Sequence, residues 1–110
     1  MLITVLKSKL AYAKITQTNL YYEGSITIDE IWMKRAAILP NEQVHVVNIN
    51  TGSRLVTYAI VGEAGSSVIG LNGPAARLGY CDDPIFILTY AQIDAQSDPV
   101  IPIIYTPTYP

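Results

Sequence analysis

The stretch that decides the fold of this chain is Tyr21-Tyr22-Glu23-Gly24-Ser25-Ile26-Thr27-Ile28-Asp29. Glycine followed by serine is a common loop dipeptide, so these residues by themselves predict a turn. Thr27, followed three places later by Glu30, fits a capping box, which predicts a helix that continues until Pro40 stops it. From local patterns we therefore expect a turn at Gly24-Ser25 that leads into a short helix.

Outside this stretch, most of the chain has the character of short strands. Five segments are rich in Val, Ile, Thr and Tyr and are separated by turn residues, namely 10–16, 43–49, 54–61, 67–71 and 85–90. A second short helix is expected to open at Pro74, because proline loses nothing at the first helical position. Many short strands with one or two short helices predict a mainly β protein built as a compact barrel.

The last twelve residues contain four prolines, which favour extended geometry over a helix. We expect this tail either to form an edge strand packed on a neighbour or to be disordered.

The chain of 110 residues has enough material for one domain, residues 1–110. Half of its residues are hydrophobic and only 15% are charged, so part of the surface is expected to be covered by self-association.

The charge pattern excludes several classes of partner. The net charge is −2 and the seven Lys and Arg residues are scattered, which is unlike the basic stripe of a nucleic-acid binder. No run approaches the roughly 18 apolar residues of a membrane span.

The single cysteine, Cys81, fits a reducing compartment, so we expect a cytoplasmic protein. His45 and Cys81 have no second ligand at metal spacing, and no metal is expected.

A set of ordered motifs points to one family. The run Tyr22–Asp29, placed about twenty residues from the start, resembles the processing site of pyruvoyl-dependent aspartate 1-decarboxylases. Further pieces match the spacing of that family from about residue 5 to residue 90: Lys9, residues 48–54, Thr57-Tyr58, Asn72-Gly73 and Ala75-Ala76-Arg77. The resemblance implies a double-psi β-barrel that assembles as a homotetramer with active sites between neighbouring subunits.

The resemblance also implies that the chain cuts its own backbone between Gly24 and Ser25. The Ser25 hydroxyl attacks the Gly24 carbonyl, the chain separates into residues 1–24 and 25–110, and Ser25 becomes a pyruvoyl group. By the same analogy, Thr57 hydrogen-bonds the oxyanion of the cyclic intermediate. Without the resemblance, Thr57 would be interpreted as an ordinary strand threonine.

The pyruvoyl carbonyl would form a Schiff base with L-aspartate, and the products would be β-alanine and CO₂ for pantothenate biosynthesis. Arg54 is the best candidate to hold a substrate carboxylate, since its planar fork makes paired charged hydrogen bonds. Lys9 would add a second cation. The competing interpretations are a surface arginine after a hairpin and a solvated lysine on a strand.

Tyr58 is, by resemblance, the proton donor after CO₂ leaves, and core packing is the competing explanation. It follows Thr57 on an expected strand, so the two side chains should point to opposite faces unless the strand is irregular. The resemblance also implies that four residues bind the substrate where a turn is expected to enter a helix, namely Asn72, Gly73, Ala75 and Ala76.

The chain also departs from the family pattern. Pro74 stands where alanine is usual, Ala11 stands where a histidine is common, and Asp82-Asp83 replaces a common Gly-Asp pair. Two other functions therefore stay open. One is an uncleaved, non-catalytic barrel that acts as an assembly or binding module, and the other is a pyruvoyl enzyme for glutamate or another acidic amino acid.

Overall fold

The computed structural model describes residues 1–109, which fold into strands with two short helices. The expectation of a mainly β protein is confirmed. The strands are β1 (Leu2–Lys14), β2 (Gln17–Asn19), β3 (Ser25–Asp29), β4 (Gln43–Asn48), β5 (Arg54–Gly62), β6 (Ile69–Asn72), β7 (Pro84–Asp94) and β8 (Ile103–Tyr105). The α-helix α1 spans Glu30–Arg35, and the 3₁₀-helix η1 spans Gly73–Leu78.

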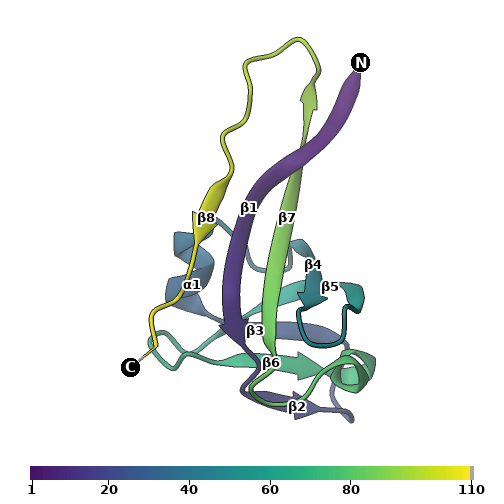
Figure 1. Cartoon of the computed structure of the whole chain (residues 1–110), viewed down its shortest axis with the longest axis vertical. Coiled ribbons are helices and arrows are strands. Elements are labelled where there is room, and N and C mark those ends of the chain that lie inside the picture. The colour runs from purple at the N-terminus through teal and green to yellow at the C-terminus, as the bar shows by residue number, and fades with distance from the viewer. Residues whose placement is uncertain (110) are drawn as a thin grey trace.

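The strands are hydrogen-bonded in the order β2-β6-β3-β5-β4-β7-β1-β8. The long antiparallel pair of β1 and β7 extends away from the other strands as an arm, with the N-terminus at its tip (Figure 1). The strand β5 pairs with β4 through residues 54–58 and with β3 through residues 59–62. It therefore joins the two parts of the sheet, and the candidate site lies along it.

The core is built from the inward side chains of several strands. Alternate residues are buried in β4 (Val44 and Val46) and in β7 (Ile85 and Ile87), as expected for strands with one face on a core. The β3 strand is different, because it lies between β5 and β6 and four of its five residues are buried. Its sequence alternates, so Ile26 and Ile28 join the hydrophobic core, while the buried polar residues Ser25 and Asp29 form hydrogen bonds.

The predicted capping box at Thr27 is wrong. Thr27 lies inside β3, and the N-cap is Asp29, whose side chain accepts a hydrogen bond from Ile31 N. The buried Asp29 carboxylate also accepts from Gly65 N and Ser67 N, so it fixes the loop before β6 as well as the helix. Strand pairing on both sides of β3 holds Thr27 in extended backbone, which overrides the local helix signal.

The helix also ends earlier than expected. It stops at Arg35, and Ala37 then takes a positive φ of 54°, three residues before Pro40.

The predicted helix after residue 72 is present as η1, with Pro74 in its first turn. The tail forms an edge strand, β8, but it runs parallel to β1 of its own chain. No helix within residues 1–109 is long and apolar enough to cross a membrane.

Candidate active site

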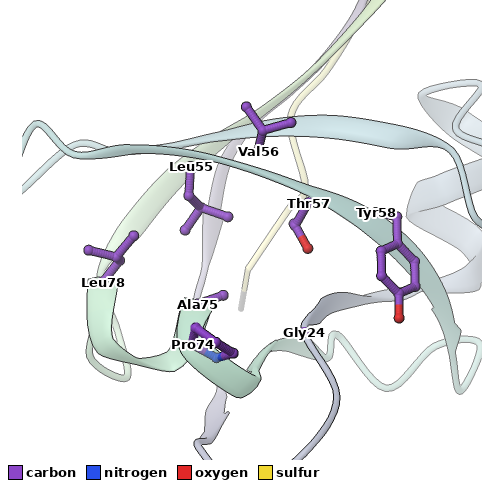
Figure 2. A pocket seen from close by; sticks show the side chains of 8 residues that line it. All are labelled: Gly24, Leu55, Val56, Thr57, Tyr58, Pro74, Ala75 and Leu78. Carbon is purple, nitrogen blue, oxygen red and sulfur yellow. The ribbon is translucent and has the colours of Figure 1, made fainter.

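A pocket of about 440 Å³ lies against the β5 strand, beside the Gly24-Ser25 bond (Figure 2). Three segments form it: β5, the loop before β3, and η1. The lining residues are Gly24, Leu55, Val56, Thr57, Tyr58, Pro74, Ala75 and Leu78. The pocket therefore brings together Gly24, Thr57, Tyr58 and Ala75, which the sequence places in separate motifs.

Ser25 is fully buried, whereas the neighbouring Gly24 is exposed. The peptide bond that joins them thus crosses from the surface into the interior. The Ser25 hydroxyl accepts a hydrogen bond of 2.9 Å from Asn72 Nδ2 and donates a long one of 3.5 Å to Glu23 O. The contact with Glu23 O places the oxygen beside the backbone that precedes Ser25, and Asn72 holds the same oxygen from the neighbouring strand β6.

The glycine that packing requires beside this bond is Gly73. Its φ is +66°, and a Cβ there would lie 2.6 Å from Tyr22 O and 2.9 Å from Gly24 N. Any side chain at Gly73 would therefore clash with the backbone of residues 22–24, in the loop before β3. At Gly24, by contrast, a Cβ would meet only Pro74 Cδ, at 3.8 Å. The folded backbone alone does not explain glycine at position 24.

Thr57 and Tyr58 both line the pocket, on the same side of the β5 ribbon (Figure 2). Simple strand alternation, which predicts opposite faces, does not hold here. The irregularity falls where β5 changes partner, since Tyr58 is the last residue paired with β4 and Ala59 is the first paired with β3. Among the hydrogen bonds of residues 1–109, none uses the Thr57 hydroxyl, which leaves it available to a group in the pocket.

Arg54 and Lys9 do not line this pocket. Both lie on the outer face of the sheet, where Arg54 Nη1 is 3.3 Å from His45 Nδ1 and 3.5 Å from Tyr90 Oη. Lys9 Nζ stands 4.5 Å from the centroid of the Phe86 ring, in a cation–π contact. The backbone register joins the two cations across the sheet, because Lys9 pairs with Leu88 and Leu88 pairs with His45. The structure thus places the two cations on one surface, apart from Ser25.

The motif at residues 48–54 has a structural role in this fold. Buried Asn48 donates to Asp83 Oδ2 and Leu78 O, and its own oxygen accepts from the backbone N–H groups of residues 50 and 51. Hydrogen bonds from the Asn48 side chain, then the Tyr80 backbone N–H, then the Asn50 side chain lower the pKa of Asp83 from its ordinary value of 3.8, while burial opposes them. Asp82 has a φ of +75°, a conformation that glycine adopts most easily.

The remaining predicted site residues surround the Ser25 side of the pocket. Asn72 and Gly73 are buried beneath it, Ala75 lines it, and Ala76 is half-buried and lies outside the lining. Sequence reasoning missed Leu55 and Leu78, and strand alternation from Thr57 could have indicated Leu55. It also missed Thr27, whose hydroxyl accepts from Asn72 Nδ2 at 3.0 Å. Within residues 1–109, no group of three or more His, Cys, Asp or Glu side chains could hold a metal ion.

The fold and the pocket define a class of protein, a double-psi β-barrel with a Gly-Ser bond at the edge of its pocket. The fold is similar to the crystal structure of the rationally designed protein mkDPBB_sym_86, with a TM-score of 0.52, 12% identity, and coverage of 70% of this chain and 90% of that chain. This likeness supports the predicted double-psi β-barrel and concerns the fold alone.

Residues 1–106 match the family model described as aspartate decarboxylase. The chain is 56% identical to the aspartate 1-decarboxylase of Coxiella burnetii over 104 residues, which cover 94% of each chain. It is 58% identical to that of Syntrophobacter fumaroxidans over 90 residues, which cover 82% of this chain and 73% of the relative. The chain belongs to the aspartate decarboxylase family.

Proposed function

We propose that this protein is a pyruvoyl-dependent enzyme that converts L-aspartate into β-alanine and CO₂, and that it works in the cytoplasm to supply pantothenate biosynthesis. The observation that carries the proposal is the Gly24-Ser25 bond at the edge of the pocket, with Ser25 Oγ held by Asn72 Nδ2 at 2.9 Å. Membership of the aspartate decarboxylase family supports the choice of substrate.

Self-cleavage starts when Ser25 Oγ loses its proton and adds to the carbonyl carbon of Gly24. The C–N bond then breaks as the Ser25 nitrogen takes up the proton that Oγ gave up, which leaves an ester between Gly24 and Ser25 and a free amine on Ser25. Removal of the Ser25 Cα proton expels the Gly24 carboxylate and forms a double bond. Water then replaces the nitrogen as ammonia, so that residues 25–110 begin with a pyruvoyl group. Thr57 donates to the oxyanion of the first step, a stabilisation that typically contributes several kcal/mol.

The residues around Ser25 fit such a group. Asn72 Nδ2 points at the Ser25 side chain, and the absence of a Cβ at Gly73 leaves a cradle that any other residue would fill. Asn72, Gly73 and Ala75 would hold the pyruvoyl group at the position of Ser25. When present, it supplies an electrophilic carbonyl, which the twenty ordinary side chains lack.

The other residues bind the substrate and move a proton. Arg54 holds a substrate carboxylate through its planar fork, and Lys9 adds a second positive charge on the same face of the sheet. The Tyr58 hydroxyl, in the pocket with Gly24, delivers a proton to the substrate carbon that has lost CO₂. The small side chains of Ala75, in the pocket lining, and of Ala76, next to it in η1, let the backbone approach the substrate.

The separation of Arg54 and Lys9 from the pocket supports a site shared between chains. We propose a homotetramer in which the outer sheet face of one chain, with Arg54 and Lys9, covers the pocket of a neighbour. Large apolar side chains are exposed along the sheet and the arm, including Val56 at 52% and Ile104 at 55%. Burying them on association would be favourable, by about 25 cal/mol for each Å² of apolar surface.

The first experiment is a denaturing mass spectrum of the purified chain after prolonged warming. We expect fragments of residues 1–24 and 25–110, with no free amino group at the start of the larger one. The cleaved protein should release CO₂ and β-alanine from L-aspartate, and glutamate at equal concentration should be a poor substrate. A chain that stays intact, or a larger fragment that begins with serine, would contradict the proposal.

The second experiment tests the shared site by mixing two inactive variants. Ser25→Ala keeps both cations but cannot form the pyruvoyl group, and a Lys9→Ala, Arg54→Ala chain is cleaved but lacks the cations. Co-expressed chains should regain part of the parent activity only if one chain supplies the cations to the pocket of another. Activity no greater than the sum of the separate variants, or a stable monomer in light scattering, would contradict the shared site.

A further inference from the structure

Thr27 is a polar residue beside the cleavage site to which the self-cleavage chemistry above gives no role. It lies two places after Ser25 in β3, so both side chains point to the same face of the strand. In the antiparallel pairing of β3 with β6, Asn72 stands opposite Ser25, and Gly70 stands opposite Thr27. The only side chain on β6 between the two hydroxyls is therefore that of Asn72, which reaches Ser25 directly and Thr27 diagonally.

The Asn72 amide nitrogen uses both of its hydrogens in this arrangement. One is donated to Ser25 Oγ at 2.9 Å, and the other to Thr27 Oγ1 at 3.0 Å. An amide group is planar, so two fixed hydrogens set both its position and its rotation about the Cβ–Cγ bond. If the Thr27 hydroxyl were absent, the amide could turn over and present its oxygen to Ser25 in place of a donor.

The Thr27 side chain is itself held in one orientation. Its methyl carbon Cγ2 lies only 3.0 Å from the point where a Cβ on Gly62 would stand, so the methyl group is packed against β5. A threonine in a strand has few χ1 rotamers, and contact of the methyl group with Gly62 leaves the hydroxyl directed at Asn72. The neighbour opposite Thr27, Gly70, has no side chain that could compete for this hydroxyl.

An amide donor on Ser25 Oγ matters most when that oxygen loses its proton. Negative charge then develops on Oγ, and a hydrogen bond from a fixed donor stabilises that charge more than it stabilises the neutral hydroxyl. We propose that Thr27 is a positioning residue for self-cleavage, which fixes the Asn72 amide so that its nitrogen faces Ser25. This inference rests on the proposed self-cleavage and assigns it a further residue.

The test compares cleavage rates of freshly purified, uncleaved chains, measured as the appearance of residues 25–110 in denaturing mass spectra. Thr27→Val keeps the shape and the methyl contact but removes the acceptor, and it should slow cleavage by about three- to tenfold. Thr27→Ser restores the hydroxyl and should cleave within about twofold of the parent rate. Thr18→Val, on the exposed strand β2, is the matched control and should cleave at the parent rate.

A double-variant comparison separates positioning from a general structural effect. If Thr27 acts through Asn72, adding Thr27→Val to Asn72→Ala should leave the rate of the Asn72→Ala chain unchanged. Three results would overturn the inference. The Thr27→Val chain could be cleaved at the parent rate, or Thr27→Val and Thr27→Ser could slow cleavage equally. The double variant could also be cleaved more slowly than the Asn72→Ala chain. If the Asn72→Ala chain does not fold, the cleavage rates of Thr27→Val and Thr27→Ser still test whether the Thr27 hydroxyl is needed. A parent chain that never cleaves would instead contradict the proposed function.

Discussion

The pocket beside Gly24 and the outer face of the sheet differ in how completely a single chain builds them. At the pocket, every group proposed for self-cleavage is present in one chain: Ser25 is held by Asn72, and Thr57 lies on β5, which pairs with β3, with no hydrogen bond to its hydroxyl within residues 1–109. On the outer face, Arg54 and Lys9 contact His45, Tyr90 and Phe86 and lie outside that pocket.

This difference indicates that the two proposed activities depend on different levels of structure. Self-cleavage joins adjacent residues, so it needs only the fold of one chain to hold the Gly24 carbonyl near Ser25. The proposed substrate binding uses two cations beside the same bond, and neither Arg54 nor Lys9 lines the pocket of its own chain. Variants at the pocket and at the outer face should therefore fail in different ways.

The largest expected effect is that of Ser25→Ala, because no hydroxyl remains to attack Gly24. Cleavage should be abolished, and the chain should stay intact in denaturing mass spectra after warming. The oligomeric state in light scattering should be unchanged, since Ser25 is buried within one chain. The matched control is Ser66→Ala, in the exposed loop before β6, which should cleave normally. Any cleavage of the Ser25→Ala chain would contradict the assignment of the nucleophile.

The second largest expected effect is the fall in kcat caused by Tyr58→Phe. The ring and its packing are kept while the proton donor is removed, so kcat should fall by about 10²-fold or more with little change in KM. Self-cleavage should proceed, because Tyr58 has no part in it. The measurement is steady-state kinetics on fully cleaved protein, with exposed Tyr80→Phe as the control. Turnover at the parent rate would make Tyr58 a packing residue.

Arg54→Ala should affect the outer face alone. Cleavage should occur at the parent rate, while kcat/KM for L-aspartate falls by about 10- to 100-fold through loss of a charged hydrogen bond. Arg35→Ala, at the exposed end of α1, is the control and should behave like the parent. Slow cleavage of the Arg54→Ala chain would show that the outer face and the pocket are coupled, which would contradict their separate roles.

The smallest expected effect is a dependence of stability on acid through Asp83, which anchors the hairpin that leads into Arg54. Hydrogen bonds lower its folded pKa below 3.8, so its contribution is present above about pH 4 and is lost as the pH falls through the folded pKa. The parent Tm should therefore decrease on acidification more than the Tm of Asp83→Asn. Asp98→Asn, on the exposed tail, should follow the parent. Parallel curves for the parent and Asp83→Asn would contradict this role.

Much of the fold was predictable because strand signals repeat along the chain. The strands β4, β5 and β7 lie close to their predicted positions, and the helix expected from Pro74 is present as η1, which begins one residue earlier, at Gly73. The error at Thr27 has a clear cause, since a capping-box pattern is a local signal and pairing with both β5 and β6 is stronger. The strand β8 could be expected only as one of two alternatives, because its pairing with β1 lies far along the chain.

The sequence by itself determined the chemical groups of this protein: a serine after a glycine, a threonine and tyrosine on one strand, and two cations in separate motifs. Tertiary structure alone decided which of them meet. The change of partner along β5 turns Thr57 and Tyr58 toward Gly24, and the register of β3 with β6 places Asn72 between Ser25 and Thr27. The physical reason is that strand pairing sets which side chains face each other, and pairing depends on residues distant in sequence.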